Sequence, residues 1–223
     1  MIRKYSLLAV TALSLAIVIP ATAYAGGTEM QLKGKGFGPP AFRSFCGRLA
    51  SICNTRSGAR VVQLTDEKRQ QLQSVNMAVN SRIRQQTDMR TNGVEDLWTI
   101  PTKAGDCEDF AILKKRELMK RGWPAASLLL TVARLPFSNE GHVVLTARTS
   151  AGDLILDSRS NSVKDWSSTS YRYYARQSQN SAGWDRIGRA IPVTNTAKLK
   201  NVGARTASLK LPDQGLIEVS ALR

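Results

Sequence analysis

The chain has 223 residues, with 32 lysine and arginine residues against 17 aspartate and glutamate residues, which gives a net charge of +15 at pH 7. This length allows one domain with a hydrophobic core, and the sequence shows neither internal repeats nor low-complexity blocks. One histidine and three cysteines supply too few ligands for a zinc site if two of the cysteines pair.

Residues 1–25 have the pattern of a secretory signal peptide. Arg3 and Lys4 precede an apolar run over residues 7–19, and small residues at positions 23 and 25 offer a cleavage site. The run has 13 residues, whereas a membrane span needs about 20, so an uncleaved anchor fits less well. We expect a periplasmic or secreted protein. Its mature net charge of +13 favours anionic envelope surfaces or an acidic substrate, or only aids solubility, and export argues against nucleic acid as a partner.

Residues 26–64 are predicted to be a lead-in segment to the domain. Glycine and proline are frequent over residues 26–42, which favours a flexible chain. Cys46 and Cys53 lie seven residues apart, and in an oxidising compartment such a pair is most simply a disulfide. Cys107 is then the odd thiol, which is either reactive or buried and inert.

Two helices are predicted before the strands begin. The first runs over about residues 65–86, because an N-cap at Thr65 is followed by an apolar stripe at helical spacing. Residues 91–93 predict a turn, and Trp98 after it could wall a cleft or belong to the core. The second helix runs over residues 106–121, with Cys107 in its first turn. There the unpaired N–H groups and the helix dipole favour the thiolate, which is the nucleophilic form of cysteine.

Strands are predicted over residues 128–135, 142–149 and 154–157, with a turn at 150–153. The result is an α+β fold in which the cysteine helix packs on an antiparallel sheet. A regular hairpin pairs residue 149 with 154 and leaves Asp157 about 13 Å along the strand from His142, although on the same face. Strong twist, a bulge or a shifted register must bring them together, or Asn161, which faces His142 in the regular register, orients the imidazole instead.

Five ordered segments resemble the bacterial transglutaminase-like cysteine proteinases. They are GDCED at residues 105–109, GHVVL at 141–145, LILD at 154–157, VNMAVN at 75–80 and DLWTIP at 96–101. The resemblance implies a papain-like or transglutaminase-like core over residues 65–189. It also implies that Cys107, His142 and Asp157 act as nucleophile, base and orienting carboxylate, and that Asn80 helps to shape the cleft.

Three carboxylates beside Cys107 should raise the pKa of its thiol and oppose ionisation. A bound Ca²⁺ would offset them, since this cation takes carboxylate oxygens. The resemblance implies calcium held by Asp106 and Glu108, whereas on physical grounds alone these acids could merely complement the helix N-terminus. No organic cofactor is expected.

The sequence therefore predicts a monomeric, exported cysteine endopeptidase that cleaves envelope or surface proteins. The resemblance implies adhesin processing as its most specific form, together with an inner-membrane regulatory partner. An acyltransferase and a non-catalytic envelope-binding protein of the same fold remain as alternatives. Residues 190–223 are predicted to form a basic C-terminal extension that is either a final strand or a loosely held tail.

Overall fold

The computed structural model describes residues 27–138 and 140–193, so the expected signal peptide and the extension beyond residue 193 lie outside the described residues. The strands are β1 (Thr28–Gly36), β2 (Arg84–Gln85), β3 (Ala104–Gly105), β4 (Leu128–Arg134), β5 (Gly141–Thr149), β6 (Gly152–Asp157), β7 (Ser160–Asp165), β8 (Arg172–Gln177) and β9 (Trp184–Pro192). The helices are α1 (Pro40–Arg48), α2 (Ala50–Cys53), α3 (Asp66–Arg82), α4 (Asp88–Asn92) and α5 (Cys107–Met119), with short 3-10 turns η1 (Ala125–Ser127) and η2 (Trp166–Ser168).

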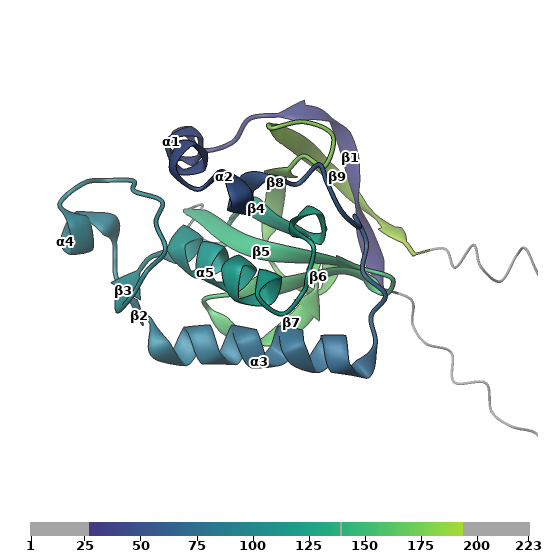
Figure 1. Ribbon diagram of the computed structural model, residues 1–223. Helices are drawn as coiled ribbons and strands as arrows, with labels where there is room; N and C mark the ends of the chain where they lie inside the picture. The colour runs from purple at the N-terminus through teal and green to yellow at the C-terminus, as the bar shows by residue number, and fades with distance from the viewer. Residues whose placement is uncertain (1–26, 139, 194–223) are drawn as a thin grey trace, which may run out of the picture.

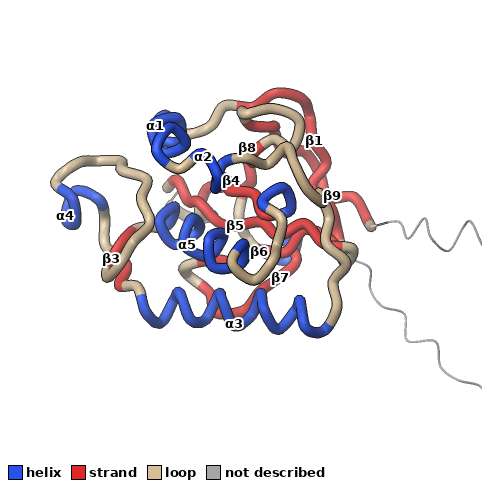
Figure 2. Tube along the Cα trace, viewed as in Figure 1, coloured by secondary structure: helices blue, strands red, loops and turns tan. Residues whose placement is uncertain are grey.

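Seven strands form one antiparallel sheet in the order β1-β9-β8-β4-β5-β6-β7, and β2 pairs separately with β3. Helix α5 lies across β5, β4 and β6, and α3 packs against α5 and β7 (Figure 1). Figure 2 shows both helices on the same side of the sheet. This is the predicted α+β architecture, a helix that begins at the cysteine and packs on an antiparallel sheet. None of the described helices is long and apolar enough to cross a membrane.

The N-terminal part of the chain is a structural strand, so the prediction of a flexible lead-in is wrong for residues 28–36. Strand β1 pairs antiparallel with β9, and Met30 is 3% exposed in the core. Thr28 donates from its backbone nitrogen and its hydroxyl to the Asp165 carboxylate, at 2.7 and 2.6 Å. Glycines and two register shifts interrupt the alternation of buried and exposed side chains along the strand, so the sequence pattern does not predict it. The folded unit therefore begins well before residue 65.

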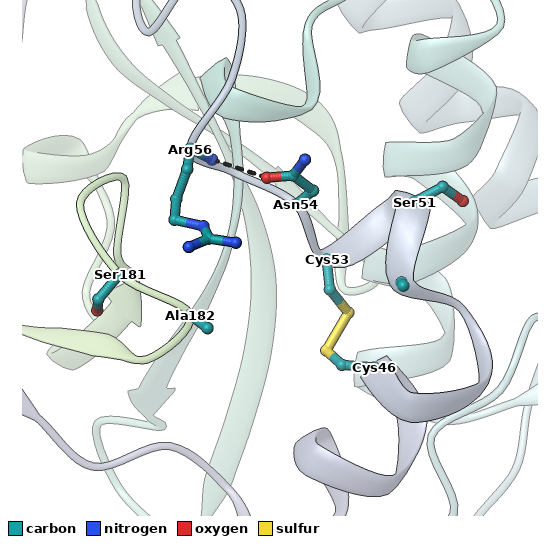
Figure 3. A pocket seen from close by; sticks show the side chains of 8 residues that line it. Cys46, Ser51, Cys53, Asn54, Arg56, Ser181 and Ala182 are labelled. Atoms are coloured by element: carbon teal, nitrogen blue, oxygen red, sulfur yellow. Dashed lines mark hydrogen bonds between the residues drawn. A yellow bond between two sulfur atoms is a disulfide. The ribbon is translucent and has the colours of Figure 1, made fainter.

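Cys46 and Cys53 form the predicted disulfide, which joins α1 to α2 (Figure 3). A pocket of about 430 Å³ lies beside it, lined by the disulfide, by Arg56 and by residues 181–182 among others. None of the other predicted site residues lines this pocket. We therefore regard the disulfide as a structural crosslink between α1 and α2 rather than as part of the reactive site.

The two predicted helices are present with shorter ends. Thr65 caps α3 by accepting the Lys68 N–H, but the helix ends at Arg82 because Ile83 takes an extended conformation. Helix α5 ends at Met119, and Gly122 follows with the left-handed φ of +80°. Nine of the 13 residues of α5 are buried, so this helix is central to the domain rather than a surface helix.

Candidate active site

The predicted nucleophile, Cys107, is the first residue of α5, and Asp106 occupies the N-cap position. The Asp106 side chain does not cap the helix as its position suggests. Its Oδ2 atom instead accepts the backbone N–H of Asp88 at 3.3 Å. Gly105 must be a glycine, because a Cβ atom there would stand 2.5 Å from Oδ2 of Asp109. The motif around the cysteine therefore packs its own acidic side chains around the start of the helix.

His142 and Asp157 lie in hydrogen-bond contact on neighbouring strands, with Nε2 2.8 Å from Oδ1. The hairpin is tighter than predicted, because Thr149 pairs with Gly152 and only two residues form the turn. Gly152 adopts a φ of +108°, a conformation that glycine tolerates. This register shortens the offset between His142 and Asp157 from four residues to two. Of the three ways considered to bring them together, the structure shows the shifted register.

Tyr171, which the sequence analysis did not single out, holds the other side of the carboxylate. Its hydroxyl donates to Oδ2 of Asp157 at 2.5 Å, and its ring meets the His142 imidazole edge-on with centroids 5.4 Å apart. Burial alone would raise the pKa of Asp157, but hydrogen bonds from His142, Tyr171 and the Arg159 backbone outweigh it and lower that pKa. The only signal in the sequence was an aromatic run at residues 171–174.

The Cys107 sulfur lies against the backbone of β5, at the residue that follows His142. The N–H of Val143, the residue that follows the histidine, donates to Sγ at 3.3 Å, and the thiol donates to Oε2 of Glu108 at 3.2 Å. Burial and the charge of Glu108 raise the pKa of Cys107 well above its usual value. Burial and the acidic neighbours therefore oppose the expected thiolate, and the helix terminus alone does not outweigh them.

Five acidic residues crowd around the start of α5. Burial is the main cause that raises the pKa of Glu108 to about 9 and that of Asp109 to about 7, and it also raises the pKa of Asp106. Carboxylate oxygens lie within 4.8 Å of one another in two sets of three, Asp88 with Asp96 and Glu108, and Asp88 with Asp106 and Asp109.

The donor set fits a hard divalent cation. Every ligand atom on offer is a carboxylate oxygen, the type that Ca²⁺ prefers, and Oδ1 of Asp106 is buried without a hydrogen-bond partner among the described residues. Asp106 and Glu108 were the predicted ligands, and the structure adds Asp88, Asp96 and Asp109 beside them. Only a weak signal in the sequence pointed to this addition, since residues 88–96 carry several acids just ahead of the cysteine motif.

The asparagines of α3 hold the turn between β6 and β7. The Asn80 side-chain nitrogen donates to the Asp157 carbonyl and to Oδ1 of Asn161, both at 3.0 Å. Asn76 donates to two carbonyl oxygens of the same turn at 2.8 and 2.9 Å. Asn161 therefore binds α3, and the alternative in which it orients His142 is wrong. These amides fix the position of the strand end that carries Asp157.

Lys114 of α5 lies fully buried near Asp157. Its Nζ atom has no hydrogen-bond partner among the described residues and stands 5.7 Å from the Phe110 ring centroid. Burial lowers the pKa of Lys114 to about 7, and the negative charge of Asp157 opposes this shift. The helical pattern of residues 106–121 does not distinguish this lysine from the other lysines of the helix.

Trp98 belongs to the core, so the idea that it walls an open cleft is wrong. It is 2% exposed and packs edge-on against Phe42, with ring centroids 5.7 Å apart. Its indole N–H donates to Oδ1 of Asp96 at 2.9 Å. The next residue, Thr99, donates from its backbone to Asp109 at 2.7 Å. The tryptophan thus anchors the loop that presents part of the acidic cluster.

The family model for bacterial transglutaminase-like cysteine proteinases matches residues 33–190. No curated protein matches the chain significantly. Among solved structures, calcium-bound LapG of Legionella pneumophila aligns with 74% of this chain and 93% of its own, at 23% identity and a TM-score of 0.46. EGTA-treated LapG of the same organism aligns with 68% of this chain and 83% of its own, at 24% identity and a TM-score of 0.45. Because the family model covers most of its length, the chain belongs to the bacterial transglutaminase-like cysteine proteinases and is a cysteine peptidase.

Proposed function

We propose that the protein is an exported endopeptidase that cleaves proteins of the cell envelope or surface through Cys107, His142 and Asp157. One observation carries the proposal. The backbone N–H of Val143 contacts the sulfur while the preceding residue, His142, is held by Asp157, so the sulfur lies one residue along β5 from an imidazole that a carboxylate already orients. Family membership supports the peptidase chemistry, and the residue roles are our assignment.

The hydrogen-bond pattern gives each group its task. Asp157 occupies Nε2 of His142, which leaves Nδ1 as the nitrogen that takes the proton from Cys107. The sulfur then attacks the peptide carbonyl, and the backbone N–H of Cys107 at the helix start can donate to the oxyanion that forms. The imidazolium next protonates the departing amine, which leaves an acyl group on the sulfur as a thioester.

Water completes the reaction in the second half. His142, neutral again after protonating the amine, takes a proton from water as the water oxygen attacks the thioester carbonyl. The carbon–sulfur bond breaks, the carboxylic acid leaves and the sulfur regains a proton. Asp157 stabilises the imidazolium in both halves and keeps its ring in one orientation. If an amine took the place of water, the product would be an amide, and incorporation of a labelled amine detects that alternative.

We further propose that Asp88, Asp96, Asp106, Glu108 and Asp109 hold a calcium ion. When bound, the ion would supply positive charge that favours the ionised carboxylates of Asp106, Glu108 and Asp109, whose pKa values burial raises. The side chains of this cluster also fix the loop over residues 96–99 against the start of α5. Glu108 accepts a hydrogen bond from the Cys107 thiol, so its engagement as a ligand would remove a group that raises the pKa of Cys107.

The location and the partners are proposals from the sequence. A signal peptide over residues 1–25 places the mature enzyme in the periplasm or outside the cell, as a monomer. A surface adhesin is the specific substrate that we propose to test first, and an inner-membrane protein is the regulator that we propose. The basic net charge of the chain favours contact with acidic surfaces there.

Mapping of new N-termini tests this function. Purified mature protein is incubated with isolated envelope proteins, with calcium or with a chelator. We expect discrete new N-termini with the wild type in calcium, and none with Cys107→Ala or His142→Ala. Stoichiometric labelling of Cys107 by iodoacetamide, with a low-pH rate that is lost in His142→Ala, would separate an active thiol–imidazole pair from a merely binding protein. Cleavage that survives in Cys107→Ala would refute the assignment.

A further inference from the structure

A pocket of about 230 Å³ adjoins Asp157 on the side away from His142. It lies between β6, β7 and the loop that leads into β8, and Tyr171 stands at its rim. Asp157 pairs with Ser160 and Ile155 pairs with Lys164, so these four side chains belong to one face of the β6–β7 hairpin. The pocket therefore continues the surface on which the imidazole and the carboxylate lie.

The lining offers unpaired hydrogen-bond donors and a positive charge. The hydroxyl groups of Ser162, Ser168 and Ser170 have no hydrogen-bond partner within the described part of the chain, and Lys164 makes no ion pair there. The positive charge of Arg159 acts on Tyr171 at the rim. Asp157 is the one acid in the lining, and donors already occupy both of its oxygens. Such a pocket suits an anionic group of two or three oxygens.

The order of contacts decides which half of a substrate reaches the pocket. In the proposed proton transfer the His142 imidazole faces the Cys107 sulfur, and the observed contacts then lead from His142 to Asp157 and from Asp157 to Tyr171 and the pocket. The imidazole protonates the departing amine, so the leaving half of the substrate lies on the imidazole side of the sulfur. An extended peptide advances about 3.3 Å per residue, so a residue two or three positions beyond the scissile bond can reach past the imidazole and the carboxylate.

We propose that this pocket is a substrate subsite that binds an aspartate or glutamate side chain at the second or third position on the leaving side of the scissile bond. Lys164 pairs with the carboxylate, and the serine hydroxyls donate to it. The inference rests on the proposed peptidase function but adds a separate claim about sequence preference. In this proposal part of the chain's excess positive charge, that of Lys164, selects substrates directly.

Cleavage-site profiling tests the preference. The wild-type protein, supplied with calcium, digests a library of proteome-derived peptides, and both sides of each cut are sequenced. We expect acidic residues to be enriched at the second or third position of the leaving half. For two peptides that differ only by Glu or Lys at that position, Lys164→Glu should lower the Glu-to-Lys ratio of kcat/KM about tenfold. Lys35→Glu, the same charge change at the far end of β1, should keep the wild-type ratio.

The outcomes separate the subsite from the chemistry. An unchanged ratio in Lys164→Glu, or an acidic preference confined to the acyl half, overturns the subsite. A wild type that cleaves nothing overturns the peptidase function instead, and peptide binding then decides the subsite without turnover. In fluorescence anisotropy the Cys107→Ala protein should bind the Glu peptide about tenfold more tightly than the Lys peptide, and adding Lys164→Glu should abolish the difference. Equal binding of both peptides to Cys107→Ala would reject the subsite.

Discussion

Tyr171 and Asp157 are joined by a hydrogen bond of 2.5 Å that fixes the carboxylate from the side opposite His142. Burial raises the pKa of Tyr171, so its hydroxyl keeps its proton and remains a donor at every physiological pH. The carboxylate consequently cannot turn away from the imidazole without losing a charge-assisted hydrogen bond. The orientation of His142 thus depends on Tyr171, which acts through the Asp157 carboxylate.

Tyr171→Phe should lower kcat about 5- to 50-fold with little effect on KM, because it removes one donor from Asp157 and loosens the imidazole. The hydrogen bonds now hold the pKa of Asp157 below its usual value, so losing one raises that pKa. The acid limb of the kcat/KM profile should therefore move to higher pH. Tyr173→Phe is the matched control, because the Tyr173 hydroxyl contacts Thr169 instead. An identical profile for both variants would mean that Tyr171 has only a packing role.

Asp157→Asn should reduce kcat/KM by about 10²- to 10⁴-fold, because a neutral amide neither stabilises the imidazolium nor fixes its tautomer. Asn161→Ala should change kcat/KM less than about threefold, since the Asn161 side chain bonds only to Asn80 among the described residues. Steady-state kinetics on the same peptide check both values. The reverse order of effects would restore Asn161 as the orienting residue.

Calcium should stabilise the folded chain. At 100 times its dissociation constant, a ligand that binds only the folded state adds about 2.7 kcal/mol, which corresponds to roughly 5–10 °C in Tm for a domain of this size. Thermal unfolding with calcium, with magnesium and with a chelator measures this shift. Asp88→Asn should shrink it, whereas Asp66→Asn, on the first turn of α3, should not. A Tm that is the same in calcium and in chelator would exclude the ion.

Lys114→Met should stabilise the fold at neutral pH by about 1–4 kcal/mol, because it removes a buried amine without a partner. The folded pKa of Lys114 is lowered to about 7 from 10.5, so between these values the unfolded chain binds the extra proton. Stability from this group therefore rises with pH across that window, and the variant should flatten the rise. Urea unfolding at pH 6.5, 8 and 9.5 measures the slope. The exposed Lys120→Met should leave it unchanged, and a slope equally steep in Lys114→Met would show that this lysine is not the cause.

The elements nearest the reactive residues could be predicted because local signals agree there. A capped, apolar helix start follows Thr65, a cysteine opens the central helix, and two strands flank a turn with a glycine. The register of that hairpin could not be predicted, because a two-residue turn and a four-residue turn both suit the residues from 150 to 153. A shift of two residues in this register brings Asp157 from four residues to two residues away from the position opposite His142.

Other features depend on contacts between distant parts of the chain. Strand β1 forms because β9 pairs with it, and no alternation of apolar and polar residues around its glycines predicts this pairing. Asp88 joins the acidic cluster through a loop that Trp98 anchors in the core, so its place follows from tertiary packing. Tyr171 reaches Asp157 from the start of β8, across the sheet face. Only the folded chain brings such residues together.

The pairing of β1 with β9 has a consequence for how the chain folds. Residues 28–36 are synthesised more than 140 residues before residues 184–192, the strand with which they pair. Until residues 184–192 appear, the waiting strand presents free backbone groups that can pair with other chains. A nascent chain of this enzyme therefore gains from a chaperone, and a protein truncated before residue 184 should aggregate rather than fold.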